Sequence, residues 1–170
     1  MDSHQLRVFA SQRYEDLERQ LTFRGIEIDS GFSLWEYLPE HDPDTAHILL
    51  RGIHALDHRR DGPDDQIVVI KLEEWWSHDP EVEPALELRG FGLNQCHYDG
   101  SVGQSDPGKM RYCYAPNQFP EEPMHWHPLT APDQHRRHAF YSADAAIQRF
   151  DLFVFQSLNS GFIVDPQAPL

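Results

Sequence analysis

Apolar residues recur at helical spacing near the start of the chain. Tyr14, Leu17 and Leu21 lie three and four positions apart, which places them on one face of a helix. Gly25 follows as a typical residue just beyond a helix end. The pattern predicts a first helix from Ser11 to Gly25.

The next segments have a less regular apolar pattern. The aromatic segment from Gly31 to Pro39 is interpreted as a short helix or as a loop that covers an edge of the core. Asp44 is a good N-terminal cap, and a second helix is predicted from there to Asp57. The apolar stripe of this helix consists of Ile48, Leu49, Ile53 and Leu56. Three histidines lie opposite the stripe and are interpreted as its solvent-exposed face: His47, His54 and His58.

From Ile67 onward the pattern changes to that of strands. The run from Ile67 to Trp76 begins as continuous apolar sequence and becomes half polar, which is typical of a central strand that emerges toward solvent. Four further strands are expected, at residues 86–92, 110–115, 125–127 and 138–141. Their hairpin-like spacing favours antiparallel pairing.

A closing helix is predicted after Ser142, which is a good cap. Its apolar face consists of Ile147, Phe150, Val154 and Leu158, and Gly161 ends it. Helices, then strands, then a helix indicate an α+β fold. We expect an antiparallel sheet of about four to five strands, with N-terminal helices and a closing C-terminal helix packed on it. Residues 1–164 should form one domain and residues 165–170 a loose tail.

Charge and cysteine content limit the partners and the compartment. The chain has 28 acidic and 14 basic residues, for a formal net charge of −14. This charge opposes binding to nucleic acid or anionic membranes unless cations gather locally. The two cysteines and an N-terminus without signal-peptide features predict a cytoplasmic protein. The longest apolar run is too short to cross a bilayer, so no membrane association is expected.

Histidines gather around the predicted fourth strand. His125 and His127 lie two positions apart, so in a strand both rings point to the same face. With His135 and His138, four of the eleven histidines fall within fourteen residues. A divalent transition metal is therefore one candidate cofactor, with these four histidines as ligands. Further donors could come from Asp133, His97 or Cys113, and a mixed site of Cys96, His97 and Cys113 is a second arrangement.

A metal-free interpretation of the same residues is acid–base catalysis on RNA. One neutral imidazole would remove the proton of a ribose 2′-hydroxyl while a protonated one donates to the leaving oxygen. His125 and His127 would carry these steps, and Arg111 would hold the phosphate. Substrate contacts would come from Tyr112, Arg136 and Arg137. A third interpretation is that the histidines are structural.

The segment MRYCYAPNQFPEEPMHWHPL has a distinctive order: Arg-Tyr, then Ala-Pro, then a proline-containing spacer, then His-x-His. This order resembles the core motif of the TumE-like toxin family of bacterial and archaeal toxin–antitoxin loci. The matching residues are Arg111, Tyr112, Ala115, Pro116, His125 and His127. The family's Asp-Asn position is Cys113-Tyr114 in this chain. The resemblance extends from Ile67 to Leu158 and implies a toxin–antitoxin or defence role with an antitoxin as protein partner, but it brings no catalytic mechanism.

The acidity of the chain supports a competing interpretation. A non-enzymatic acidic protein could be an antitoxin, an immunity or inhibitor protein, or a decoy that mimics nucleic acid. Acidic runs at residues 42–44 and 61–65 favour it. The sequence thus leaves two functions open, an enzyme and a binding protein, and it indicates no oligomeric state.

Overall fold

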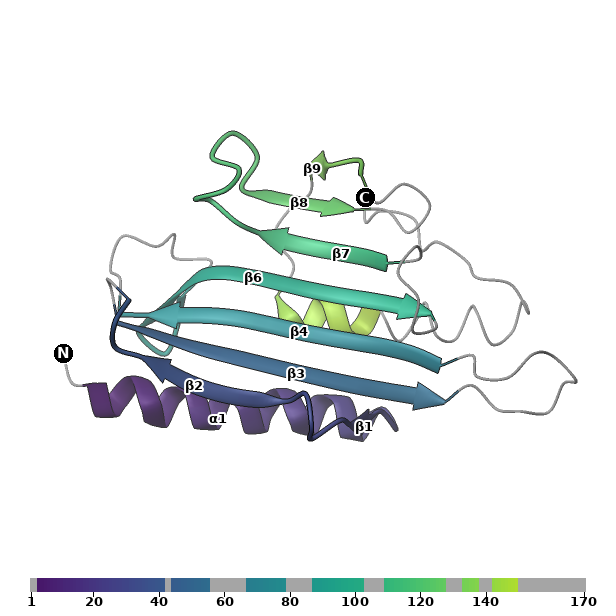
Figure 1. Cartoon of the computed structure of the whole chain (residues 1–170), viewed down its shortest axis with the longest axis horizontal. Coiled ribbons are helices and arrows are strands. Elements are labelled where there is room, and N and C mark those ends of the chain that lie inside the picture. The colour runs from purple at the N-terminus through teal and green to yellow at the C-terminus, as the bar shows by residue number, and fades with distance from the viewer. Residues whose placement is uncertain are drawn as a thin grey trace, which may run out of the picture.

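One antiparallel sheet dominates the computed structural model, which describes residues 3–41, 44–55, 67–78, 87–102, 109–127, 133–137 and 142–149. The elements are α1 (Ser3–Phe23), β1 (Glu27–Ile28), β2 (Leu34–Leu38), β3 (Thr45–Ala55), β4 (Ile67–Ser77), β5 (Glu87–Leu88), β6 (Phe91–Val102), β7 (Lys109–Tyr114), β8 (Met124–His127), β9 (Arg136–Arg137) and a short helix at 143–149. The predicted α+β class is confirmed, with one N-terminal helix, a dominant antiparallel sheet and a short C-terminal helix (Figure 1).

The strands follow one another across the sheet in chain order. The sheet order is β1-β3-β4-β6-β7-β8-β9, and β2 pairs with β3 beside β1, while β5 pairs with β6. The turn between β5 and β6 has positive φ at Arg89 (54°) and Gly90 (85°), as a two-residue hairpin turn requires. The described residues thus form nine strands, more than the four to five expected.

The two faces of the sheet differ in what lies against them. Both α1 and the helix at 143–149 lie on one face, which we call the helix-covered face (Figure 1). Its core residues from the central strands include Ile48, Leu50, Ile70, Leu72, Tyr98, Tyr112 and Trp126. Because side chains alternate along a strand, the intervening residues point to the opposite face. We call this second face the polar face, and it carries His47, Glu73, His97, Asp99, Arg111, Cys113, His125 and His127.

The first helix is confirmed and begins eight residues earlier than predicted, at Ser3. Leu6, Phe9 and Ala10 extend its buried stripe toward the N-terminus, so the same core contacts stabilise the added turns. The closing helix also begins as predicted. The Ala145 N–H donates to Ser142 Oγ at 3.4 Å, which is the expected capping contact. Residues after 149, including the expected tail, lie outside the described residues.

The second predicted helix, from Asp44 to Asp57, is wrong. This segment forms β3, which pairs with β4 along all eleven of its residues. The segment from Gly31 to Pro39 is likewise neither helix nor loop, since it contains β2. His47 and His54 therefore lie on opposite faces of a strand instead of one face of a helix. His58 lies outside the described residues.

The strand predictions from Ile67 onward have mixed outcomes. The strands at 67–76, 110–115 and 125–127 are confirmed as β4, β7 and β8. Residues 86–92 contain a hairpin turn between β5 and β6, so they are not one strand. The strand expected at 138–141 lies outside the described residues, and β9 forms just before it. Among the described helices, none has the length and apolar character needed to cross a membrane.

Candidate functional site

The hairpin of β7 and β8 positions the candidate site. Its register places Cys113 opposite His125 and Arg111 opposite His127, so these four side chains share the polar face. The connection between the strands is held by its own backbone bonds. The Ala115 N–H donates to the Pro123 carbonyl at 2.9 Å, and other N–H groups of the loop donate to Ala115 and Phe119. The site is therefore built on a paired ladder with an ordered turn.

Three of the four predicted histidines come together, and we call His125, His127 and His135 the histidine cluster. The ring centroids of His125 and His127 are 5.1 Å apart. The His135 ring lies 4.7 Å from that of His125, nearly parallel to it, and 4.5 Å from that of His127. Phe119 from the hairpin loop packs its ring edge-on against both His125 and His135. The fourth histidine, His138, lies outside the described residues.

Cys113 joins this cluster from the neighbouring strand. One ligand atom each from Cys113, His125 and His127 lie within 4.8 Å of one another. Burial raises the pKa of the Cys113 thiol to about 12, although the nearby charge of Arg111 acts in the opposite direction. A thiol with such a pKa is protonated at neutral pH. Thiol and imidazole donors at this separation are suited to a transition metal.

The cluster is graded from buried to exposed. His125 is fully buried and Cys113 is 5 % exposed, whereas His127 is half-buried and His135 is exposed. His125 Nδ1 lies 2.9 Å from the backbone carbonyl of Glu122. A carbonyl only accepts hydrogen bonds, so Nδ1 carries the proton and Nε2 carries the lone pair.

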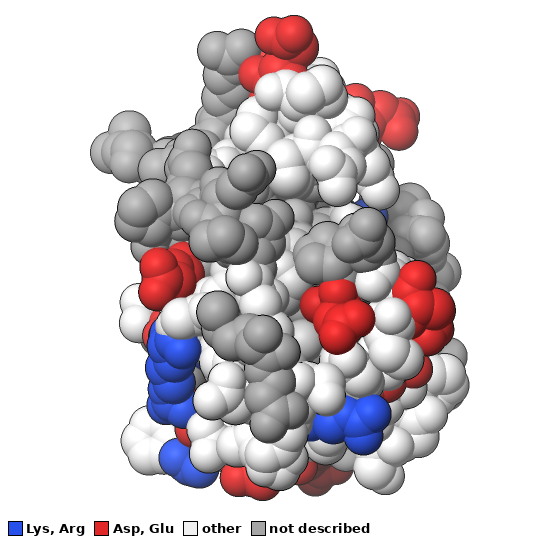
Figure 2. Space-filling model, turned by 90° about the vertical axis from the view of Figure 1, so that its left-hand side faces the viewer, with Lys and Arg blue, Asp and Glu red and all other residues white. Residues whose placement is uncertain are grey.

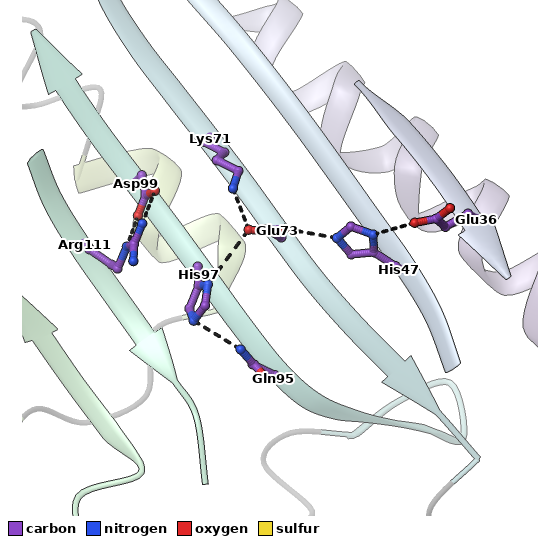
Figure 3. A network of polar contacts seen from close by, with 8 residues as sticks. All are labelled: Glu36, His47, Lys71, Glu73, Gln95, His97, Asp99 and Arg111. Atoms are coloured by element: carbon purple, nitrogen blue, oxygen red, sulfur yellow. Dashed lines mark hydrogen bonds and ion pairs between the residues drawn. The ribbon is translucent and has the colours of Figure 1, made fainter. Parts of the chain in front are cut away.

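Arg111 lies beside the cluster, but its charge is already paired. Its Nε and Nη2 donate to the two carboxylate oxygens of Asp99 at 2.6 and 2.8 Å (Figure 3). The Asp99 side chain is 3 % exposed, so this bidentate pair is largely desolvated. Hydrogen bonding to Asp99 raises the pKa of Arg111. Arg111, the predicted phosphate-binding residue, is therefore paired with Asp99, which the sequence analysis did not include.

Two of the predicted substrate-binding residues, Tyr112 and Arg136, lie on the helix-covered face and not at the cluster. Tyr112 is 1 % exposed and pairs with Trp126 on the helix-covered face. The Arg136 guanidinium lies 5.3 Å from the centre of the Trp126 ring. Arg137 pairs with His125 in the backbone register. Alternation along the strand could have separated Tyr112 from Arg111 and Cys113 at the sequence level, because adjacent residues point to opposite faces.

The mixed cysteine site of Cys96, His97 and Cys113 does not form. Cys96 pairs with Tyr114 and is buried among the core residues of the helix-covered face. His97 pairs with Cys113 on the polar face. The two cysteines therefore lie on opposite sides of the sheet.

On the polar face, a network of polar side chains extends across β2, β3, β4 and β6, with Glu73 at its centre (Figure 3). Its contacts are Lys71 Nζ to Glu73 (2.6 Å), His47 Nε2 to Glu73 (3.1 Å), His97 Nδ1 to Glu73 (3.8 Å), His47 Nδ1 to Glu36 (3.0 Å) and Gln95 Nε2 to His97 (3.3 Å). Burial opposes ionisation of Glu73, but contacts with His47, His97 and Lys71 hold its pKa well below the ordinary value. We call these six residues the Glu73 network.

The contacts of His47 within this network favour its protonated form. Each of its ring nitrogens faces a carboxylate, and an ionised carboxylate accepts hydrogen bonds only, so both nitrogens must donate. Burial alone would lower the pKa of His47, but the hydrogen bonds to Glu73 and Glu36 outweigh it and raise the pKa. The ring also stacks on Trp75 at 4.8 Å. Sequence reasoning missed this network, although the alternation of Lys71, Glu73 and Trp75 along one strand was a signal for it.

Comparisons of the chain with protein-family models, curated proteins and solved structures find no match. The chemistry available at the site follows from its donor groups. The histidine cluster offers imidazole groups suited to proton transfer, and together with Cys113 it can bind a metal ion. The Glu73 network, by contrast, has its acids and bases paired with one another.

Proposed function

We propose that the protein is a bacterial toxin–antitoxin or defence-associated protein and that its histidine cluster cleaves RNA. The observation that carries this proposal is the convergence of three imidazoles, from β8 and from residues 133–137, on one part of the polar face. Cleavage of RNA requires a group that removes the 2′-hydroxyl proton and a group that protonates the leaving oxygen. The resemblance to TumE-like toxins supports the cellular role, with an antitoxin as the protein partner in the cytoplasm.

The members of the histidine cluster have different access to a substrate. His135 is exposed and is the member that would exchange protons with the RNA. His125 is fully buried and would act from behind the reacting groups. His127 is half-buried and lies between them. Because Tyr112 and Arg136 belong to the other face, we assign no RNA contact to them.

Two features limit how tightly RNA would bind. The net charge of −14 removes long-range attraction, and Arg111 is already paired with Asp99. The proposed enzyme therefore has low affinity for RNA in general and depends on local contacts at the site. This restricts the substrate to single-stranded segments whose backbone can enter a small site.

Induced expression in bacteria tests the toxin role. Wild-type protein should arrest growth, and His127→Ala and His135→Ala should each restore it at equal protein levels. His54→Ala is the matched control, since His54 lies on another strand and its Nδ1 is 3.3 Å from the Gly25 carbonyl. Purified protein should cleave labelled RNA but not DNA of the same sequence. Normal growth with abundant wild-type protein, together with intact RNA, would overturn the proposal.

The second candidate is a non-enzymatic binding protein for a basic partner, and the charge distribution favours it. On the end of the molecule drawn in Figure 2, acidic side chains are spread over the face while cations gather in its lower part. A complex held by such charges should dissociate as ionic strength rises. Co-purification of a basic partner at low salt, with its loss at high salt and no effect of His135→Ala, would select this function over RNA cleavage.

A further inference from the structure

We propose that Cys113, His125 and His127 bind a divalent transition-metal ion, with a fourth coordination position beside His135. This metal site goes beyond the proposed RNA cleavage and does not depend on it. Within the described residues, these three side chains form the group whose ligand atoms converge, all lying within 4.8 Å of one another. Two come from one strand and the third from its hydrogen-bonded neighbour.

The separation of the donors is close to what a metal requires. Metal bonds of about 2.0–2.3 Å to nitrogen and sulfur place tetrahedral donors roughly 3.3–3.8 Å apart. Because the ligand atoms lie within 4.8 Å of one another, they need to approach by at most about 1–1.5 Å, which rotations about the side-chain bonds can provide. The backbone need not move, because the register of β7 and β8 already sets Cys113 opposite His125.

The surroundings of His125 prepare it as a ligand. Its Nδ1 proton is held by the Glu122 carbonyl at 2.9 Å, so Nε2 presents the lone pair. Such an outer contact fixes the tautomer and the orientation of a metal-binding imidazole. Phe119 packs against the same ring at 4.7 Å and limits access of water from that side.

The donor set selects the class of metal. A thiolate with two imidazoles favours zinc and similar borderline-soft ions over magnesium or calcium, which prefer oxygen donors. Cys113 binds as the thiolate, and its proton passes to solvent when the metal–sulfur bond forms. Three protein ligands with one remaining position is the arrangement found in catalytic zinc sites. His135, exposed and 4.5 Å from His127 between ring centroids, lies where it can act on a molecule bound at that position.

His47 also lies on the polar face, but it is not suited to bind a metal ion. Both nitrogens of His47 face carboxylates, so its imidazolium has no lone pair for a metal. The proposed metal site and the Glu73 network are thus two separate groups of side chains on one face.

Cobalt(II) is the probe for this site, added to full-length protein that has no histidine tag. One equivalent should bind per chain, give a thiolate-to-cobalt charge-transfer band and visible bands of tetrahedral cobalt, and be displaced by zinc. Cys113→Ser should remove the thiolate band and weaken binding by more than the roughly 10- to 100-fold loss that follows removal of an outer contact. Cys96→Ser is the matched control, because the same chemical change on the opposite face should leave the band and the stoichiometry intact.

Two further variants keep the test decisive. His127→Gln changes a half-buried ligand and should weaken cobalt binding even if Cys113→Ser does not fold, whereas His135→Ala should keep the thiolate band and the one-to-one stoichiometry. Failure to bind one equivalent, or equal binding by wild type and Cys113→Ser, would overturn the metal site. Metal binding without RNA cleavage would overturn only the proposed function, and RNA cleavage by a protein that binds no cobalt would overturn only the metal site.

Discussion

Glu73 and Glu74 are neighbours in β4, yet they lie on opposite faces of the sheet and in different chemical environments. Glu74 is fully buried on the helix-covered face, where it accepts hydrogen bonds from Arg13, Trp76 and Tyr98. Burial would raise its pKa, but Arg13 keeps the pKa below the ordinary value. Glu73 has a side chain that is 13 % exposed and contacts two histidines and a lysine.

The difference between these glutamates reflects the division of the molecule. On the helix-covered face the buried Arg13–Glu74 ion pair connects α1 to the sheet and lies within the hydrophobic core. Such a pair adds little net stability over an apolar pair, but it is costly to break. On the polar face, ionisable groups remain within reach of water and of one another. The ionisable groups of the candidate site therefore lie on the polar face, and the hydrophobic core lies on the helix-covered face.

The largest effect is expected from Glu74→Gln. The change removes the charge opposite Arg13 and places an amide N–H among groups that all donate hydrogen bonds. Breaking a buried ion pair by removing one partner costs about 3–5 kcal/mol. Urea unfolding followed by circular dichroism should show a decrease of this size in the free energy of unfolding.

A double variant tests whether the loss of stability comes from leaving one buried charge without its partner. Arg13→Met combined with Glu74→Leu replaces both charges with apolar groups, so its loss should be smaller than that of Glu74→Gln alone. A Glu74→Gln protein with wild-type urea resistance would show that the pair is not buried as described.

Gly52→Ala should have the next largest effect. An added Cβ at Gly52 would lie 2.4 Å from Ile26 Cγ2 and 3.5 Å from Leu21 Cδ1, where α1 and the following segment pack on β3. Ile26 is branched at Cβ and cannot move this methyl group without changing its rotamer. Overpacking of this kind costs roughly 1–3 kcal/mol, measurable in the same urea experiment.

Gly31→Ala provides the comparison for Gly52→Ala. An added Cβ at Gly31 would have Asp29 Oδ1 as its nearest atom, at an ordinary contact distance of 3.6 Å. Its unfolding free energy should therefore stay near that of the wild type. Equal losses for the two glycines would show that crowding under α1 is not the cause, because the entropy effect of Gly→Ala on the unfolded chain is by itself stabilising.

The helix-covered face was the easier half to predict from sequence, apart from β3. Leu17 and Leu21 recur at a clean helical period, and Ile67 to Trp76 reads as a buried strand. In β3 the inward residues Ile48 and Leu50 alternate with His47 and Leu49, which are also large. A strand with bulky side chains on both faces lacks a clear two-residue period, and pairing with β4 decided its conformation.

The site was predictable in part. His-x-His in a strand puts both rings on one face from alternation alone, and the structure has this arrangement. The choice of Cys113 as their neighbour depends on the register of β7 with β8, which the loop of residues 115–123 sets. No local pattern encodes that register. The pairing of Arg111 with Asp99 likewise depends on two strands meeting, so the sequence could not show that this charge was already paired.

A smaller loss than for Glu74→Gln is expected from Glu73→Gln. The change removes the charge shared by Lys71, His47 and His97, but water can partly replace the carboxylate on this half-exposed face. We expect the free energy of unfolding to fall by about 1–2 kcal/mol, which lies between the values typical of surface and buried charged contacts. High salt should reduce this loss and leave that of Glu74→Gln nearly unchanged, because buried pairs are screened less. A loss as large as that of Glu74→Gln would remove the distinction between the faces.

The smallest effect is a pH dependence from His47. Its folded pKa is raised above the ordinary 6.5, so the protonated ring stabilises the fold fully below that pH. The contribution is lost as pH rises through the raised folded value. The difference in unfolding free energy between wild type and His47→Gln should therefore shrink as the pH rises above 6.5. Both Glu36 and Glu73 face the ring, and the pKa of Glu73 is lowered, away from this range. The difference between wild type and Glu74→Gln should stay flat, since the pKa of Arg13 is raised and that of Glu74 is lowered, away from this range. A His47→Gln difference that is constant or grows with pH would show that the ring is not held as a cation, and the contrast between the two glutamates would then rest on burial alone.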